Sequence, residues 1–166
     1  MANAVAGKTS NSKRTIRVKV DDYELRSLLA TFSKMDDIAK NDMKKIAQDL
    51  AERGANYAKG AANNAPYNVR QAQAVAQSIK ISKSDKAPSF SIGGRQKVGS
   101  SAFSAGYVIM GNEFGSKQYK QFPRRSGKGG KEGWWLYRAM SRFQPTIAQE
   151  WLKGYEKVRD AWTSRV

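Results

Sequence analysis

Residues 36–66 read DDIAKNDMKKIAQDLAERGANYAKGAANNAP, and this stretch decides the fold. Small and apolar residues recur in it at spacings of three and four, which places them on one face of a helix of about six turns. These residues are Ala39, Met43, Ile46, Leu50, Gly54 and Tyr57. Asp36 and Asp37 precede the pattern, where carboxylates favour a helix start, and the breakers at 63–66 end it. The stretch therefore predicts a long central amphipathic helix.

A second helical pattern fills the C-terminal part of the chain. Its apolar stripe consists of Leu136, Met140, Phe143, Ile147, Trp151, Tyr155, Val158 and Trp162. Pro145 interrupts the stripe, and a proline inside a helix costs about 3 kcal/mol because it lacks the backbone N–H. We therefore predict a kink or a break after Phe143, with Pro145 opening a new helix.

Strand-like segments lie on either side of the central helix. Alternating or short apolar runs occur at residues 15–20, 78–83, 89–92 and 107–110. Turns rich in Gly, Ser and Pro separate the last three runs, which is typical of an antiparallel meander. The predicted fold is therefore α+β, with a meander of three to four strands packed against the central helix and the Pro-interrupted C-terminal helix. We assign residues 67–76 to a loop or turn and expect a short helix after Asp21 or Asp22.

Length and composition indicate one domain with two extensions. A chain of 166 residues fits a single domain. Residues 1–14 are small, polar and basic, so we predict a flexible basic N-terminal arm ahead of a domain at 15–166. Residues 115–133 lack periodicity and are rich in glycine and lysine, which predicts an extended basic loop.

Several function classes are disfavoured by composition. The chain has no cysteine and no histidine, so it lacks thiol chemistry, zinc-thiolate sites and the usual general base near neutral pH. No apolar run approaches the ~18–20 residues that a membrane span needs, and residues 1–15 lack the order of a signal peptide. We expect no enzymatic activity, no cofactor, no metal and no membrane contact.

The net charge of +16 is concentrated in the arm and in the middle of the chain. A surface of this kind attracts nucleic acid or acidic proteins. In the predicted loop, Tyr119 and Phe122 accompany six bases, and such a mixture can grip phosphates and stack on bases. The alternative interpretation is a solvated loop or a docking loop for an acidic protein.

Two adjacent tryptophans follow the loop. Trp134 and Trp135 cannot both be buried by one face of a helix, because adjacent residues point in different directions. Tryptophan is a favoured anchor of protein interfaces, so we expect at least one of the pair to face a partner or a loop.

The order of these elements and one short motif resemble a known family. The motif is Glu113-Phe114-Gly115-Ser116, which follows a predicted strand, and Phe122-Pro123 and a C-terminal helix follow it. The chain thereby resembles the neck or tail-completion (head–tail connector) proteins of long-tailed bacteriophages, which carry a Glu-Phe-Gly-Thr/Ser motif and a Pro-Phe-type motif.

The resemblance implies a structural virion protein without chemistry of its own. Such proteins form rings at the junction of head and tail, so a homo-oligomer, a hexamer or a dodecamer, is expected, with connector and tail proteins as neighbours. The chain would be assembled in the host cytoplasm and end in the virion. Non-specific contact with DNA is compatible with its charge.

On physical grounds we select candidate contact residues in the arm, the motif, the loop and the tryptophan pair. They are Lys8, Lys13, Arg14, Glu113, Phe114, Gly115, Lys117, Tyr119, Lys120, Phe122, Arg124, Arg125, Lys128, Lys131, Trp134 and Trp135. Among them, we expect Glu113 to pair with a nearby arginine, Phe114 to pack into the core and Gly115 to adopt a positive φ.

Two other interpretations remain open at this stage. One is a non-specific nucleic-acid-binding protein that uses the basic loop and arm. The other is a histidine-free nuclease that uses a metal, for which the sequence offers only isolated carboxylates.

Overall fold

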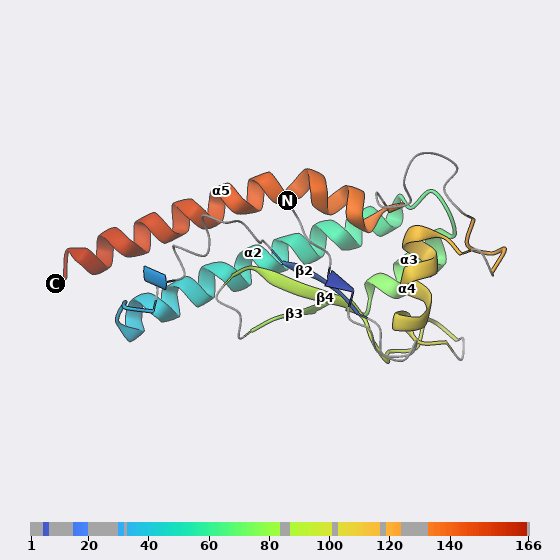
Figure 1. Ribbon diagram of the computed structural model, residues 1–166, viewed down its shortest axis with the longest axis horizontal. Helices are drawn as coiled ribbons and strands as arrows, with labels where there is room; N and C mark the ends of the chain where they lie inside the picture. Colours follow the sequence, from blue (N-terminus) through green and yellow to red (C-terminus); the bar gives the residue numbers. More distant parts are fainter. Residues whose placement is uncertain are drawn as a thin grey trace.

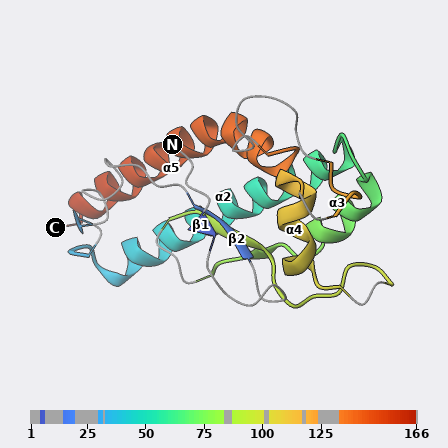
Figure 2. The same ribbon diagram turned by 45° about the vertical axis from the view of Figure 1, so that its right-hand side comes forward.

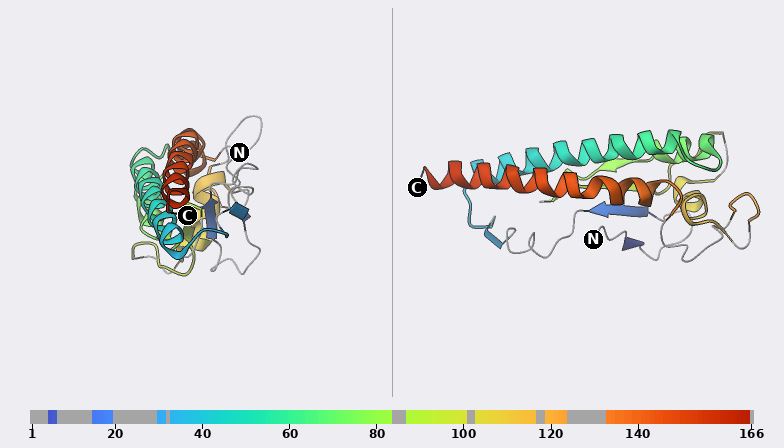
Figure 3. Two further views of the ribbon diagram at one scale, coloured as in Figure 1. Left: turned by 90° about the vertical axis from the view of Figure 1, so that its left-hand side faces the viewer. Right: turned by 90° about the horizontal axis from the view of Figure 1, so that it is seen from above.

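The computed structural model describes residues 5–6, 15–19, 30–31, 33–83, 87–100, 103–116, 119–123 and 133–165. Two long helices lie side by side, and an antiparallel sheet lies against them (Figures 1 and 3). Two short helices gather at the end where the first long helix ends and the second begins (Figure 2). The predicted α+β class, with an antiparallel sheet against long helices, is confirmed.

Helix α2 spans Asp37–Asn63, as the opening stretch predicts. Asp36 caps it, since its Oδ1 accepts the N–H of Ala39 at 2.7 Å. The buried face is made mostly of small residues, namely Ala39, Met43, Ala47, Leu50, Ala51, Gly54, Ala55, Ala58 and Ala62. Tyr57, which the pattern placed on the same stripe, is 43% exposed.

Helix α5 spans Leu136–Thr163 and runs antiparallel to α2 (Figure 1). Glycines allow the two helices to approach closely. Ile46 of α2 packs against Gly154 of α5, and Ile147 of α5 packs against Gly54 of α2. An ion pair between Arg53 and Glu150 joins the helices at the surface, with Nη2 and Oε1 3.0 Å apart.

Of the predicted kink or break at Pro145, the break with a new helix opening there is wrong. Helix α5 is continuous, with Pro145 inside it and exposed. Both flanks are held by α2: the ring of Phe143 stacks on Tyr57 at a centroid distance of 4.5 Å, and Ile147 packs over Gly54. This packing on both sides of the proline favours a continuous helix although one backbone hydrogen bond is missing.

In the part of the chain that the structure describes, the sheet has four strands in the order β1-β2-β4-β3, all antiparallel. Their bounds are Val5–Ala6 for β1, Thr15–Lys19 for β2, Lys80–Ile81 for β3 and Ser89–Gly93 for β4. The predicted strands at 15–20 and 89–92 are therefore confirmed and pair directly, with Ile16 opposite Ile92. The run at 78–83 contributes two residues only, because Ser78 is buried and its Oγ binds the N–H of Gly93 and the C=O of Val75.

The predicted strand at 107–110 is wrong. These residues lie in helix α4, which spans Ala105–Phe114 and is capped by Ser104. A short apolar run that is buried on several sides has no period that separates strand from helix. The surrounding core decides the matter, since α4 packs against α3 and β4 and buries Val108 and Ile109.

The segment 67–76, predicted as a loop or turn, also contains a helix. Helix α3 spans Val69–Ala76. Asn68 adopts a left-handed conformation at its start (φ 46°), and its side chain accepts the N–H of Gln71. The helix buries Ala72, Val75 and Ala76, a spacing of three and four that is too short to stand out in the sequence.

Three predicted features lie wholly or mostly outside the described residues. In the predicted arm at 1–14 the structure describes only Val5 and Ala6, which pair with Arg17 and Ile16. The short helix expected after Asp21 or Asp22 falls almost entirely outside, as does the middle of the basic loop at 115–133.

Candidate functional site

Glu113 lies in the last turn of α4 and is fully buried. Its carboxylate caps the start of α5, accepting the N–H of Tyr137 on Oε1 at 2.7 Å and the N–H groups of Leu136 and Trp135 on Oε2 at 3.0 and 3.2 Å. Its backbone C=O accepts the N–H of Trp134 at 2.8 Å. We call Glu113 and these four N–H groups the clasp. The partners of Glu113 in the described chain are thus backbone amides, not the arginine that we expected.

The clasp places a carboxylate in an apolar setting. Burial raises the pKa of Glu113 to about 7 from an ordinary value of 4.5, while the backbone N–H groups of residues 134–137 act to lower it. A negative charge at this point suits the positive end of the α5 dipole. Both carboxylate oxygens already accept hydrogen bonds from backbone N–H groups. We therefore assign Glu113 a structural role.

Glycines on both sides of the clasp fit it sterically. Gly115 ends α4 with φ +78°, which confirms the predicted positive φ. Gly133 has φ +59°, and a Cβ there would lie 2.8 Å from Cβ of Tyr137 and overlap the carboxylate of Glu113. Phe114 is half-buried against the core, close to the position expected for it.

Trp135 connects the clasp to the short helices. Its indole is 3% exposed, and its Nε1–H donates to Oδ1 of Asn112 at 2.7 Å. The amide of Asn112 in turn donates to Oε1 of Gln71 in α3 at 3.2 Å. This chain of hydrogen bonds joins the starts or ends of α5, α4 and α3, so Trp135 is a core residue of the single chain and not a free contact residue.

Phe122 is also a core residue, which corrects its selection as an exposed contact. It is 5% exposed, and its ring covers Gly111, where a Cβ would come within 2.6 Å of it. Tyr119 remains 40% exposed, and its hydroxyl lies 2.8 Å from that of Tyr107, a hydrogen bond that raises the pKa of Tyr107. Lys120 is exposed to solvent.

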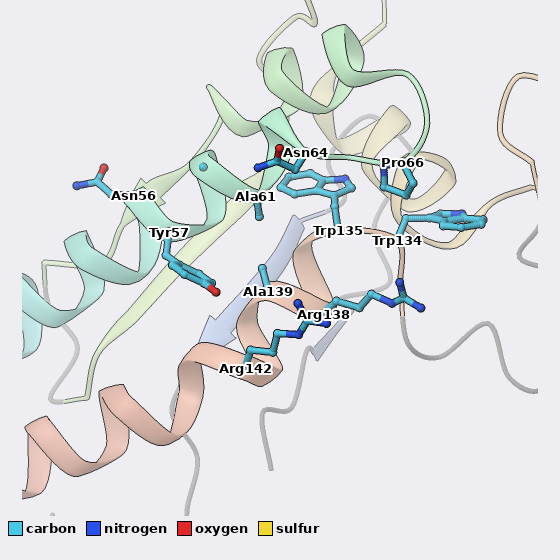
Figure 4. Close-up of a pocket in the computed structure, with 11 residues that line it drawn as sticks. Asn56, Tyr57, Ala61, Asn64, Pro66, Trp134, Trp135, Arg138, Ala139 and Arg142 are labelled. Carbon is cyan, nitrogen blue, oxygen red and sulfur yellow. The ribbon is translucent and has the colours of Figure 1, made fainter.

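A groove opens beside the clasp, between the end of α2 and the start of α5 (Figure 4). Its volume is about 630 Å³. Three of its lining residues are small, namely Gly60, Ala61 and Ala139, and the others are aromatic, amide or cationic side chains and one proline. These are Asn56, Tyr57, Asn64, Pro66, Trp134, Trp135, Arg138 and Arg142.

The two tryptophans divide their roles at this groove. Figure 4 shows Trp135 turned toward α2 and Trp134 turned away from it. The ring of Trp134 is half-buried and meets Tyr67 edge-on at a centroid distance of 4.7 Å. The two rings point in different directions, as their adjacency predicts, although both precede the first residue of α5.

The structure thus gathers only part of the predicted set. Glu113, Trp134 and Trp135 meet at the clasp and groove, and Phe114, Gly115, Tyr119, Lys120 and Phe122 lie around the end of α4. The remaining selected residues, Lys8, Lys13, Arg14, Lys117, Arg124, Arg125, Lys128 and Lys131, lie outside the described residues.

Sequence reasoning missed Tyr57, Gly60, Arg138 and Arg142 as groove residues. The sequence did contain a signal for the two arginines. Arg138 and Arg142 are four residues apart, so they lie on one face of the predicted helix, and the tryptophan pair at 134–135 precedes them closely. The signal for Gly60 was hidden, because the glycine looked like part of the helix end.

Within the described ranges, no group of three or more acidic side chains is placed to hold a metal ion. In that same portion, no helix is both long and apolar enough to cross a membrane. Comparisons of the chain with models of protein families, with curated proteins and with solved structures found no match.

Proposed function

We propose that this chain is a structural protein of a tailed bacteriophage that forms a ring at the head–tail junction. Its role would be that of a neck, tail-completion or tail-terminator subunit, and it would act through protein–protein contacts without catalysis. The expected neighbours are further copies of the chain, in a hexamer or dodecamer, and the adjoining connector and tail proteins. Its place would be the virion, after assembly in the host cytoplasm.

The observation that supports this proposal is the use of the Glu113-Phe114-Gly115-Ser116 motif. The resemblance to the phage family depends on this motif, and here each of its first three residues has an architectural task. Glu113 caps α5, Phe114 packs against the core and Gly115 ends α4. A carboxylate occupied in this way is poorly suited to general acid–base chemistry, because its oxygens already accept backbone N–H groups.

The groove adds a surface of the kind that proteins use to bind proteins. Aromatic and arginine side chains are enriched at interface hot spots. Trp134, Tyr57 and the two exposed arginines Arg138 and Arg142 line one continuous groove. Its mixture of apolar, aromatic and cationic lining residues resembles a protein interface more than an enclosed catalytic pocket.

The oligomeric state and the location of the chain test the proposal. Light scattering after size exclusion, followed by negative-stain electron microscopy, should give discrete rings that grow with protein concentration. Mass spectrometry should detect the chain in purified particles at a copy number that matches the ring. A chain that remains monomeric at all concentrations and is missing from particles would contradict the proposal.

Non-specific nucleic-acid binding is the second candidate. It is favoured by the charge of +16 and by the two arginines that line the groove together with Tyr57. Fluorescence anisotropy with labelled duplex and single-stranded DNA measures it. Binding should weaken steeply with salt, with a slope set by the number of phosphates contacted. The absence of binding at low salt would exclude this candidate.

A further inference from the structure

Gly60 lines the groove and is exposed, and no other part of the described chain fills the space beside it. A Cβ at this position would meet no atom within 4 Å. Three other helical glycines are covered by a neighbour, namely Gly54 by Ile147, Gly111 by Phe122 and Gly154 by Ile46. Glycine inside a helix costs about 1 kcal/mol relative to alanine. Packing explains that cost at the other three positions but not at the exposed Gly60, where the open space can take a side chain from another molecule.

The groove also has a definite charge. Among the residues that the structure describes, two arginines and no carboxylate line it. Arg142 is exposed and takes part in none of the ion pairs found within the described ranges. Tyr57 also lines the groove and is 43% exposed, which adds aromatic surface. A complementary occupant therefore carries a carboxylate next to an apolar side chain.

Such a surface exists at the opposite end of α2. Ile38 lies in the first turn and is 59% exposed, more than any other large apolar side chain in the described ranges. Its neighbour Asp37 has a side chain that is 96% exposed, with only a long contact of 3.8 Å to Lys40. The described residues 33–42 carry three carboxylates and two bases, a net charge of −1 in a chain of +16.

We propose that the first turn of α2 in one copy of the chain docks into the groove of a second copy. Ile38 would fill the space above Gly60, and the carboxylate of Asp37 would face Arg142. The two surfaces lie about 33 Å apart along one rigid helix, at 1.5 Å per residue, so a copy cannot fill its own groove with its own first turn.

The contact is therefore head-to-tail. Heterologous contacts of this kind close into a ring when the rotation between neighbours fits, and otherwise extend as a filament. The inference rests on the proposed ring and specifies which two surfaces meet in it.

Substitution of Gly60 tests the groove side. Gly60→Leu places a branched side chain in the space that Ile38 would take, whereas Gly60→Ala adds one methyl group and serves as the matched control. Both replace a helical glycine by a good helix former, so both should fold, as circular dichroism and urea unfolding will verify. Sedimentation velocity should give at least a tenfold weaker self-association for Gly60→Leu and a much smaller change for Gly60→Ala.

Substitution of the first turn tests the other side. Ile38→Asn should weaken self-association as much as Gly60→Leu does, and Leu152→Asn, at an exposed apolar position of α5, should not. An equimolar mixture of Gly60→Leu and Ile38→Asn retains one intact contact per pair, so it should form heterodimers and no rings. A mixture that stays monomeric would contradict the pairing.

A charge swap identifies the partners directly. Asp37→Arg and Arg142→Glu should each weaken assembly, and the double variant should recover it, because opposite charges again face each other at every contact. If the wild type forms rings and all these variants do so equally, the inference is wrong and the proposed function stands. If the wild type never assembles, the proposed function itself fails.

Other occupants are outcomes of the same experiments. If Gly60→Leu leaves self-association unchanged but weakens binding to DNA or to another virion protein, a different partner uses the groove and the inference is overturned.

Discussion

Gly133 lies against the carboxylate of Glu113 so closely that a Cβ at residue 133 would overlap Oε1 of that side chain. The contact joins the segment that opens α5 to the last turn of α4. It also fixes the direction in which α5 leaves the clasp, because Oε1 binds the N–H of Tyr137 at the same time. The stability of this joint is therefore sensitive to small changes at either residue.

Gly133→Ala should destabilise the chain by about 2–4 kcal/mol, since it combines an unfavourable positive φ with displacement of the carboxylate. Gly99→Ala is the matched control, because Gly99 has nearly the same φ of +58° but open space around it. The control should lose about 1 kcal/mol only. Urea unfolding measures both, and equal losses would show that the clasp contributes nothing beyond the backbone conformation.

Glu113 should make the stability of the chain depend on pH near neutrality. Its pKa is raised from 4.5 to about 7 in the folded state. Between these values the folded chain holds a proton that the unfolded chain has released, so the free energy of unfolding falls as pH rises through this window, by about 3 kcal/mol at most. A ¹³C NMR titration of the Glu113 carboxyl should have its midpoint near pH 7.

Glu113→Gln removes the titrating group and should remove this part of the pH dependence. Glu150→Gln is the control, because Arg53 lowers the pKa of Glu150 and its contribution has the opposite sign: it is present above the ordinary pKa and is lost as pH falls. Unfolding of the three proteins by urea from pH 4.5 to 8 separates the effects. A slope for Glu113→Gln equal to that of the wild type would refute the assignment.

Phe122→Ala should cost about 3–5 kcal/mol of stability, because the ring is buried over Gly111 and its removal leaves a cavity. Tyr119→Phe, in the same segment, removes an exposed hydroxyl hydrogen bond and should cost less than about 1 kcal/mol. The comparison by thermal and urea unfolding distinguishes a core role for Phe122 from a contact role. A stable Phe122→Ala chain would return the residue to the set of exposed contacts.

Pro145→Ala should stabilise the chain by about 1–3 kcal/mol, because it restores an N–H that can donate to the C=O of Ser141 within a continuous helix. Thr146→Ala, at the neighbouring exposed position, reports the gain from helix propensity alone and should stay below about 0.7 kcal/mol. A variant at position 145 that is no more stable than the control would mean that the helix already compensates for the proline.

The sequence was a good guide where a pattern repeats over many residues. The stripe of α2 runs from Ala39 to Tyr57, and the stripe of α5 runs from Leu136 to Trp162. Errors came in short segments: the run at 107–110 has four apolar residues and fits a strand or a buried helix equally well. Helix α3 was not predicted for the same reason, since its eight residues make too few turns for a clear period.

The candidate site was predicted less well than the fold. The sequence singled out Glu113 and the tryptophan pair, and the structure places all three at one joint. The sequence could not show that the partners of Glu113 are backbone N–H groups, because residue identities do not reveal which backbone groups lie close to a side chain. The groove escaped notice because it is made by residues near positions 60 and 138, which only the antiparallel packing of α2 and α5 brings together.

The amino-acid sequence by itself determined the two long helices, the main strand pair and the α+β class, because these depend on periodicities of 3.6 and 2 that are local. Only the tertiary structure decided that residues 107–110 are helical, that α5 passes through Pro145 and that Phe122 is core. In each case the deciding free energy comes from residues distant in the chain, such as Gly111 under Phe122 and Tyr57 against Phe143. Local preference differs between the alternatives by a few kcal/mol at most, and burial against such partners exceeds it.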